Sequence, residues 1–153
     1  MRQRIYIDNS VLGGYYDKEF EEDTLMFFQR IENKDFNVHL SEITNAELVL
    51  APQRVKDVVK KIPADCLTLL QFTEEAQELS KHYIEEKALG QASLNDAYHI
   101  AIATIYRLDV LVSWNFKNIV NLDKIRQFNA INFKFGYPFI DIRTPKELIK
   151  YED

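Results

Sequence analysis

Four side chains with oxygen donors stand at positions from which they could act together on a metal ion: Asp8, Glu47, Asp96 and Asn115. Carboxylate and amide oxygens form a hard donor set that suits Mg²⁺ or Mn²⁺, whereas zinc prefers nitrogen and sulfur ligands. A divalent cation held by such oxygens can activate water and stabilise the charge on a phosphodiester under in-line attack. The residue types therefore indicate metal-assisted hydrolysis of a phosphate ester, provided that the fold brings them together.

Each of these side chains also has a simpler interpretation. Asp8 begins the run Asp8-Asn9-Ser10, which is typical of a turn after a strand. Glu47 could be an exposed charge on a helix, and Asp96 a favourable acid at a helix N-terminus. Asn115 could be a turn-forming residue in a loop. Acids at strand ends are common, so spacing alone leaves both interpretations open.

Short β-prone runs alternate with helical patterns along the whole chain, which predicts a parallel sheet joined by right-handed helical crossovers. The pattern predicts strands at residues 5–7, 38–40, 66–72, 110–112 and 139–142, and a turn at Gly13-Gly14. It predicts helices over residues 19–32, 41–52, 54–61, 73–84, 93–105 and 122–128, and a short one that a capping box opens at Thr144. The expected fold class is α/β, a three-layer α/β/α sandwich with a mainly parallel, about five-stranded central sheet.

The carboxyl ends of parallel strands are where ligands bind in such sheets. Asp8 falls at the end of the first predicted strand, and Asn115 lies just past the fourth. Glu47 lies on the helix after the second strand, and Asp96 lies in the first turn of the helix before the fourth. We therefore expect all four side chains to converge on one edge of the sheet.

Length and composition limit the class of protein. The 153 residues are enough for one domain with its own core, expected to span residues 1–153. The apolar runs are too short to cross a bilayer, which takes roughly 20 residues, and the N-terminus lacks the apolar core of a secretory leader. With the lone Cys66 interpreted as a buried apolar residue, these features predict a cytoplasmic protein without a membrane partner.

Charge is unevenly distributed along the chain. The net charge of −5 argues against a protein that coats nucleic acid, but not against a nuclease, whose catalytic carboxylates are themselves acidic. Residues 17–23 are strongly acidic, whereas basic residues dominate from Lys117 onward. These could be solvated faces. Alternatively, Lys117 and Lys124 could belong to a basic flank that receives the phosphates of a substrate.

The four candidate metal ligands lie in motifs that resemble those of PIN domains. Four runs are similar to the four PIN motifs and occur in the same order, at residues 5–12, 41–48, 95–101 and 111–116. The first is an apolar strand that ends in Asp8 followed by small polar residues, and the second is a Ser that leads to a helical Glu. The resemblance extends from about residue 3 to residue 142. No single motif is specific, but the four occur in the right order.

The resemblance implies a Mg²⁺- or Mn²⁺-dependent ribonuclease in which Asp8, Glu47 and Asp96 bind or orient the metal, with Ser10 and Ser113 as polar supports. Many relatives are VapC-like toxins of toxin–antitoxin pairs, so it also implies RNA as the substrate, an antitoxin protein as a partner and a homodimer. One position departs from the family pattern. Where the fourth motif usually supplies an Asp, this chain has Asn115, which would be a weaker fourth ligand.

That departure keeps other functions open. The domain could be a nuclease-inactive PIN-like module that binds RNA or a protein, or an unrelated α/β hydrolase of small phosphate esters. His99, one helical turn after Asp96, could hold substrate or shuttle protons, or could be a hydrogen-bonded structural residue. Trp114 and Phe116 could stack on bases or belong to the core.

Overall fold

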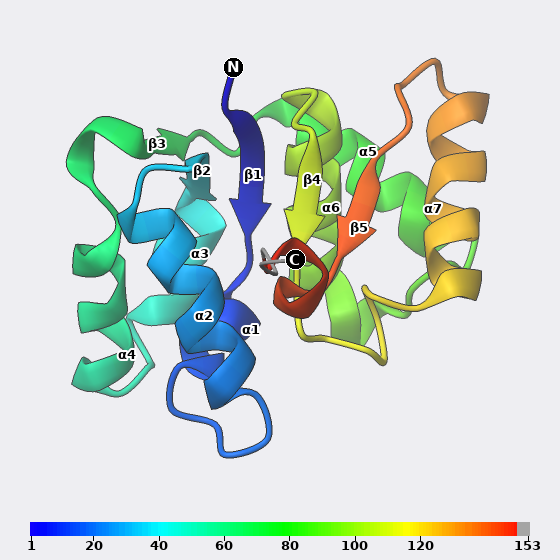
Figure 1. The fold of residues 1–153 in the computed structure, drawn as a ribbon. Coiled ribbons are helices and arrows are strands. Elements are labelled where there is room, and N and C mark those ends of the chain that lie inside the picture. The colour runs from blue at the N-terminus through cyan, green and yellow to red at the C-terminus, as the bar shows by residue number, and fades with distance from the viewer. Residues whose placement is uncertain (150–153) are drawn as a thin grey trace.

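The fold is a five-stranded parallel sheet flanked by helices, as Figure 1 shows for this computed structural model, which describes residues 1–149. The strands are β1 (Gln3–Ile7), β2 (Phe36–Ser41), β3 (Leu67–Leu70), β4 (Val110–Val112) and β5 (Asp141–Arg143), in the spatial order β3-β2-β1-β4-β5. The helices are α1 (Asn9–Gly14), α2 (Glu21–Glu32), α3 (Glu42–Leu48), α4 (Gln53–Val58), α5 (Glu74–Glu85), α6 (Leu94–Ile105) and α7 (Leu122–Lys134). Short 3₁₀ turns are η1 (Val59–Lys61), η2 (Ala64–Cys66), η3 (Gln91–Ser93) and η4 (Pro145–Leu148).

All four strand pairings are parallel, so the strands end at the same edge of the sheet, the lower edge in Figure 1. The central strand β1 pairs with β2 on one side and β4 on the other, for example through Tyr6 with His39 and with Leu111. The residue that follows β1 therefore lies at the centre of this edge.

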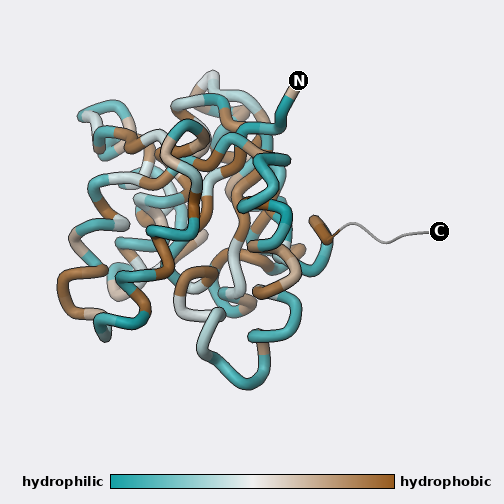
Figure 2. Tube along the Cα trace, turned by 60° about the vertical axis from the view of Figure 1, so that its left-hand side comes forward, coloured by the Kyte–Doolittle hydropathy of each residue, from teal (hydrophilic) through white to brown (hydrophobic). Residues whose placement is uncertain are grey.

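The two faces of the sheet are covered by two separate apolar cores. Ile5 and Ile7 of β1 belong to the core that includes α1, α2 and part of α4, whereas Tyr6 between them belongs to the core built with α5, α6 and α7. Successive strand residues point to opposite faces, so a strand buried on both sides must be apolar throughout. Figure 2 shows apolar (brown) segments in the middle of the trace. The predicted three-layer sandwich is confirmed.

The sequence-based elements agree with the structure at most positions. Ser41 and Thr73 cap α3 and α5 through their hydroxyls, as their places before apolar periodic segments predict. Several elements differ in extent or type. The strand predicted at residues 66–72 covers only Leu67–Leu70, the one predicted at 139–142 lies at Asp141–Arg143, and the helix predicted at 41–52 ends at Leu48. Helix α7 continues to Lys134, and the capping box at Thr144 opens a 3₁₀ turn rather than an α-helix.

The segment after β1 differs from the prediction. Residues 9–14 form the helix α1, where the Gly13-Gly14 pair indicated a turn. Gly14 is needed for packing rather than for a turn, because a Cβ there would lie 2.8 Å from Cδ1 of Trp114 and 2.8 Å from Oγ1 of Thr24. The helix begins directly at Asp8, which is its N-cap.

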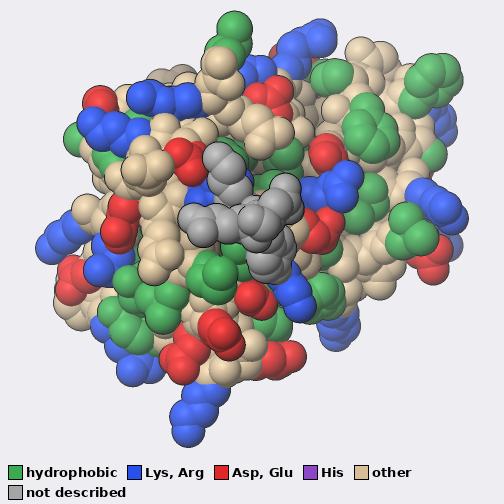
Figure 3. All heavy atoms as spheres, in the orientation of Figure 1, with side chains coloured by type: hydrophobic (Ala, Val, Ile, Leu, Met, Phe, Trp, Pro, Cys, Tyr) green, Lys and Arg blue, Asp and Glu red, His purple; other side chains and the backbone are tan. Residues whose placement is uncertain are grey.

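The acidic segment at residues 17–23 leads into the first turn of α2, which contains Glu21, Glu22 and Asp23. Figure 3 shows acidic side chains gathered toward the lower part of the face that it presents. Within the described residues, no helix is both long enough and apolar enough to span a membrane.

Candidate active site

Asp8 lies at the carboxyl end of β1 and is the most enclosed of the four predicted metal ligands, with a relative exposure of 4%. Its Oδ1 accepts hydrogen bonds from the Ser10 hydroxyl at 2.5 Å and from the backbone N–H of Val11 at 3.3 Å, which caps α1. Its Oδ2 accepts from the Ser113 hydroxyl at 2.6 Å. The two serines that the resemblance implies as supports thus both donate to Asp8.

The same serines fix the loop that follows β4. The backbone N–H of Trp114 donates to Ser10 Oγ at 2.8 Å, and that of Asn115 donates to Ser113 Oγ at 2.9 Å. Trp114 is buried and stacks on Phe20, with ring centroids 4.4 Å apart. It is therefore a core residue in this structure. The two hydroxyls hold the end of β4 against the end of β1, and the indole packs the loop against Phe20 and donates to Thr24 Oγ1.

Asp96 lies in the first turn of α6, where two asparagine side chains meet it. Asn118 Nδ2 donates to Asp96 Oδ2 at 3.0 Å, and Asn115 Nδ2 lies 3.4 Å from the same oxygen. The carbonyl oxygen of Asn115, the atom expected to act as a ligand, accepts the backbone N–H of Asn118 at 3.0 Å. In this arrangement Asn115 closes a turn and orients Asp96.

Glu47 in α3 contacts His99, which lies on α6 three residues after Asp96. His99 Nε2 meets Glu47 Oε1, and His99 Nδ1 meets the Tyr6 hydroxyl at 2.5 Å. Tyr6 Oη also lies 2.7 Å from Ser41 Oγ. His99 has a relative exposure of only 2%, so this contact is buried on the histidine side.

The carboxylates of the site are within electrostatic reach of one another. Burial raises the pKa of Asp8 above its ordinary value, hydrogen bonds from Ser10 and Ser113 oppose the rise, and repulsion from Asp96 adds to it. Burial also raises the pKa of Asp96, against the hydrogen bond from Asn118, and repulsion from Glu47 adds to that rise. Negative charge is therefore concentrated at this edge of the sheet.

The chemistry of these donors fits a hard divalent cation. The carboxylates of Asp8, Asp96 and Glu47 supply oxygen ligands, and their shared repulsion is what a bound cation relieves. Asn9, next to Asp8, has a buried Oδ1 that lacks a hydrogen-bond partner in the structure of residues 1–149. In the same residues, no three Asp, Glu, His or Cys side chains are grouped closely enough to form a metal site. The fit therefore rests on donor type and charge.

The two predicted substrate lysines differ in their surroundings. Lys117 is exposed in the loop that follows β4, two residues after Asn115. Lys124, in the first turn of α7, is partly buried and donates from Nζ to the backbone carbonyl of Ala88 at 2.5 Å. Lys117 is thus the better placed of the two to meet a ligand at this edge.

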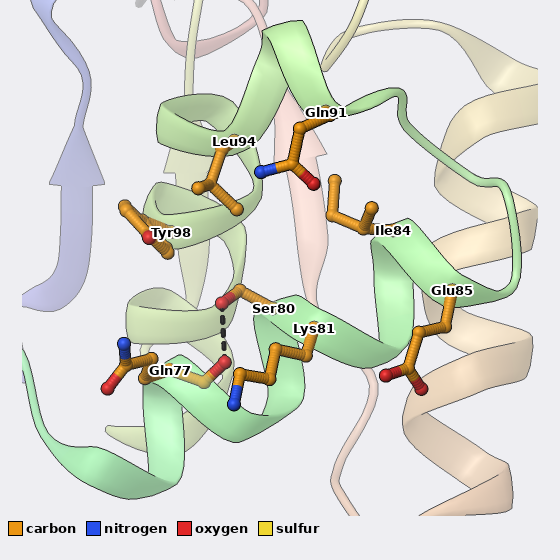
Figure 4. Close-up of a pocket in the computed structure, with 8 residues that line it drawn as sticks. All are labelled: Gln77, Ser80, Lys81, Ile84, Glu85, Gln91, Leu94 and Tyr98. Carbon is orange, nitrogen blue, oxygen red and sulfur yellow. Dashed lines mark hydrogen bonds between the residues drawn. The ribbon is translucent and has the colours of Figure 1, made fainter.

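A cavity of about 300 Å³ lies elsewhere, between α5 and α6, as Figure 4 shows. It is lined by Gln77, Ser80, Lys81, Ile84, Glu85, Gln91, Leu94 and Tyr98. Its Ser80 hydroxyl donates to the carbonyl of Gln77 in the preceding turn. None of the predicted site residues lines it, so it is separate from the carboxylate site.

Comparison with known proteins places this geometry in a family. The family model described as PIN domain matches residues 5–117, which include Asp8, Glu47, Asp96 and Asn115. The chain belongs to the PIN domain family. Among curated proteins, no sequence matches the chain significantly.

Solved structures confirm the PIN fold. FitAcB from Neisseria gonorrhoeae is 18% identical with a TM-score of 0.58, and the match covers 94% of this chain and 99% of that one. DNA-bound VapBC from Salmonella typhimurium is 21% identical with a TM-score of 0.56, covering 95% and 99%. A toxin–antitoxin complex from Klebsiella pneumoniae is 18% identical with a TM-score of 0.56, covering 78% and 93%.

Sequence reasoning overlooked two parts of this PIN site. One is Asn118, which lies three residues after Asn115. At that spacing a turn can form in which the backbone N–H of Asn118 donates to the Asn115 side chain, and this turn directs the Asn118 side chain toward Asp96. The sequence indicates only a strand at Tyr6, and nothing local in it indicates the contact of Tyr6 with His99, 93 positions away. The packing of α6 against the face of the sheet that carries Tyr6 brings Tyr6 and His99 together.

Proposed function

We propose that this PIN domain is a Mg²⁺- or Mn²⁺-dependent endoribonuclease that hydrolyses RNA phosphodiester bonds, and that it is the toxin of a toxin–antitoxin pair. The observation that supports this most is the placement of Asp8 and Asp96 at the same edge of the sheet, each raised in pKa by burial and each held by neutral donors. Neutral donors orient these carboxylates and leave their negative charge for a cation.

In this proposal Asp8, Asp96 and Glu47 hold the metal ion. Ser10 and Ser113 fix both oxygens of Asp8, so that the carboxylate cannot rotate away. The bound metal would supply hydroxide at neutral pH and stabilise the charge that develops on the phosphate. Lys117, exposed beside the site, would attract the RNA backbone, and Lys124 would contribute more weakly because its ammonium is already bonded to a carbonyl.

The matched structures support a protein partner. Two of the matched structures are described as a toxin–antitoxin complex and as DNA-bound VapBC. We propose that this chain is likewise neutralised by an antitoxin protein, forms a homodimer and acts in the cytoplasm as a single domain. Co-expression with the neighbouring open reading frame should relieve growth inhibition by the chain, and sedimentation should give twice the mass of 18.0 kDa.

A second candidate is a nuclease-inactive PIN domain that binds RNA or a protein. The feature that favours it is Asn115, which is neutral and whose oxygen already accepts a backbone N–H. A site with one fewer carboxylate loses Coulomb attraction for the cation, and could persist as a binding surface. The third possibility, a hydrolase of small phosphate esters, lacks a comparable observation.

A metal titration followed by a cleavage assay separates these functions. The purified chain is incubated with Mg²⁺ or Mn²⁺ and either RNA or nucleoside phosphates, alongside Asp8→Asn and the matched control Asp57→Asn, a partly exposed acid on α4. The endoribonuclease predicts metal-dependent cleavage of RNA by the wild type and the control, and none by Asp8→Asn. RNA binding without cleavage supports the inactive module, and cleavage of nucleotides alone supports the small-ester hydrolase.

A further inference from the structure

A buried chain of polar side chains crosses the domain behind the proposed metal site. It runs from Ser41 at the end of β2 through Tyr6 of β1 to His99 of α6 and ends at Glu47 of α3. Tyr6, Ser41 and His99 are each at least 98% buried. Buried polar networks of this kind are costly unless every member is satisfied, and a satisfied network rigidifies its surroundings.

The direction of this chain follows from its first residue. Ser41 Oγ accepts the backbone N–H groups of Ile43 at 3.2 Å and Thr44 at 3.4 Å as the N-cap of α3. A hydroxyl oxygen has two acceptor lone pairs, so its remaining role toward Tyr6 is to donate. Tyr6 can then give its own proton to His99 Nδ1, 2.5 Å away.

The opposite end requires the same direction. An ionised carboxylate can only accept hydrogen bonds, so His99 Nε2 must carry the proton that it shares with Glu47 Oε1. Tyr6 as donor at Nδ1 leaves the ring proton on Nε2. The two ends of the chain thus agree on where the imidazole proton lies.

The chain also closes on the element from which it starts. Ser41 caps the N-terminus of α3, and Glu47 lies in the last turn of the same helix. The position of the Glu47 side chain is therefore fixed by α3, whose N-cap is part of the chain, and by its contact with His99 of α6. With Oε1 committed to His99, the second oxygen, Oε2, accepts no hydrogen bond within residues 1–149 and can meet a ligand.

We propose that His99 is a positioning residue: its Nε2–H holds the Glu47 carboxylate, and Tyr6, anchored on the N-cap of α3, holds the imidazole. The proposal rests on the proposed function only in assigning Glu47 to a divalent cation. A buried histidine that merely fills the core would tolerate any isosteric side chain that keeps the domain folded, and this difference is testable.

Two substitutions at His99 separate the roles of its two nitrogens. In His99→Gln the side-chain amide can reach the place of Nε2 and still donate to Glu47, whereas in His99→Asn the shorter amide reaches only the place of Nδ1. Mn²⁺ alone is the probe, with its dissociation constant measured by the loss of the free-ion electron paramagnetic resonance signal.

We expect His99→Gln to bind Mn²⁺ within about threefold of the wild type. We expect His99→Asn to bind about 10- to 100-fold more weakly, the range typical for loss of a group that orients a metal ligand. Circular dichroism spectra should show both variants folded. Equal affinities for the two folded variants would overturn the proposal.

A measurement on the wild type does not depend on the folding of any variant. The ¹⁵N spectrum of the histidine rings, recorded without metal or RNA, reports which nitrogen of His99 carries a proton. The protein contains three histidines, and His39→Gln and His82→Gln assign the signals by elimination. We expect a protonated Nε2. A ring that is protonated on Nδ1 alone would refute the proposal.

These outcomes also distinguish this inference from the proposed function. If the chain cleaves no RNA while Nε2 is protonated and the Gln and Asn variants differ in Mn²⁺ affinity, the nuclease assignment fails and the positioning role stands. If RNA is cleaved but both variants bind Mn²⁺ equally, the positioning role fails and the nuclease assignment stands.

Discussion

Replacing Asp96 with Asn tests whether this acid binds a metal ion or instead stabilises the fold. The ionised form of Asp96 is disfavoured by burial and by the nearby Glu47. The substituted side chain keeps an oxygen that can accept from Asn118 Nδ2, now 3.0 Å from Asp96 Oδ2. We therefore expect metal-free Asp96→Asn to be as stable as the wild type or slightly more stable, because a like-charge repulsion is removed.

The magnitude of the metal effect can be stated in advance. A ligand that binds only the folded state at a hundredfold excess over its Kd stabilises that state by about 2.7 kcal/mol. For a chain of this size, 1 kcal/mol shifts the Tm by about 2–4 °C, so saturating Mn²⁺ should raise the wild-type Tm by about 5–11 °C. We expect most of that rise to disappear in Asp96→Asn. Differential scanning calorimetry with and without Mn²⁺ measures both values.

Two results would refute the reasoning about Asp96. If the metal-free variant is unfolded or strongly destabilised, then Asp96 is a structural acid at the start of α6 and not a ligand. If the variant keeps the whole Mn²⁺-induced rise, then the cation binds elsewhere. Asp57→Asn, at a partly exposed position on α4, is the matched control and should keep the whole Mn²⁺-induced rise in Tm.

Further predictions concern the neighbouring loop, the basic flank and the packing of α1. Asn115→Asp should tighten Mn²⁺ binding by about tenfold, or about 1.4 kcal/mol, because it adds a unit charge beside the site; unchanged affinity in calorimetry would remove this position from the metal site. Replacing Lys117 and Lys124 with Gln should weaken RNA binding about equally for all sequences and flatten its salt dependence; equal salt slopes for variant and wild type would contradict this. Gly14→Ala should destabilise the folded protein by about 1–3 kcal/mol through overpacking. Gly13→Ala, with nothing within 4 Å of the added Cβ, should stabilise it by about 0.5–1 kcal/mol. Equal denaturation midpoints for the two variants would show that close packing does not require Gly14.

The pH dependence of stability has a definite sign. Asp8 and Asp96 have pKa values raised in the folded state, so at mildly acidic pH the folded protein binds more protons than the unfolded chain. Their contribution to the free energy of unfolding is therefore complete below the pKa values of the unfolded chain, and it is lost as pH rises through the raised pKa values of the folded state. Metal-free Asp8→Asn should lack part of this dependence in urea titrations at a series of pH values. An identical profile for the variant would show that Asp8 does not titrate differently on folding.

Local signals were sufficient for most of the fold. The run before Asp8 and the run at residues 110–112 are apolar throughout because these strands are buried on both faces. The hydroxyls of Ser41 and Thr73 mark helix starts. The helix α1 was overlooked because two glycines usually indicate a turn, while the reason for Gly14 is contact with Trp114. That reason lies 100 positions away and cannot be read locally.

The site was predictable in position but not in its contacts. Strand ends identify the edge where Asp8 and Asn115 lie, because parallel strands end together. Which atom of Asn115 faces Asp96 depends on the turn that Asn118 closes, and the partner of Glu47 depends on how α3 packs on α6. Such side-chain orientations are fixed by tertiary packing, which residue types alone do not determine.

The most direct test of the central claim is a crystal structure of the wild type grown with Mn²⁺, with data collected to reveal the anomalous signal of the metal. The account predicts an anomalous peak at the carboxyl edge of the sheet, within about 2.0–2.6 Å of carboxylate oxygens of Asp8 and Asp96, the range for hard divalent cations. A well-ordered site without a peak at saturating Mn²⁺, or a peak elsewhere on the domain, would contradict it.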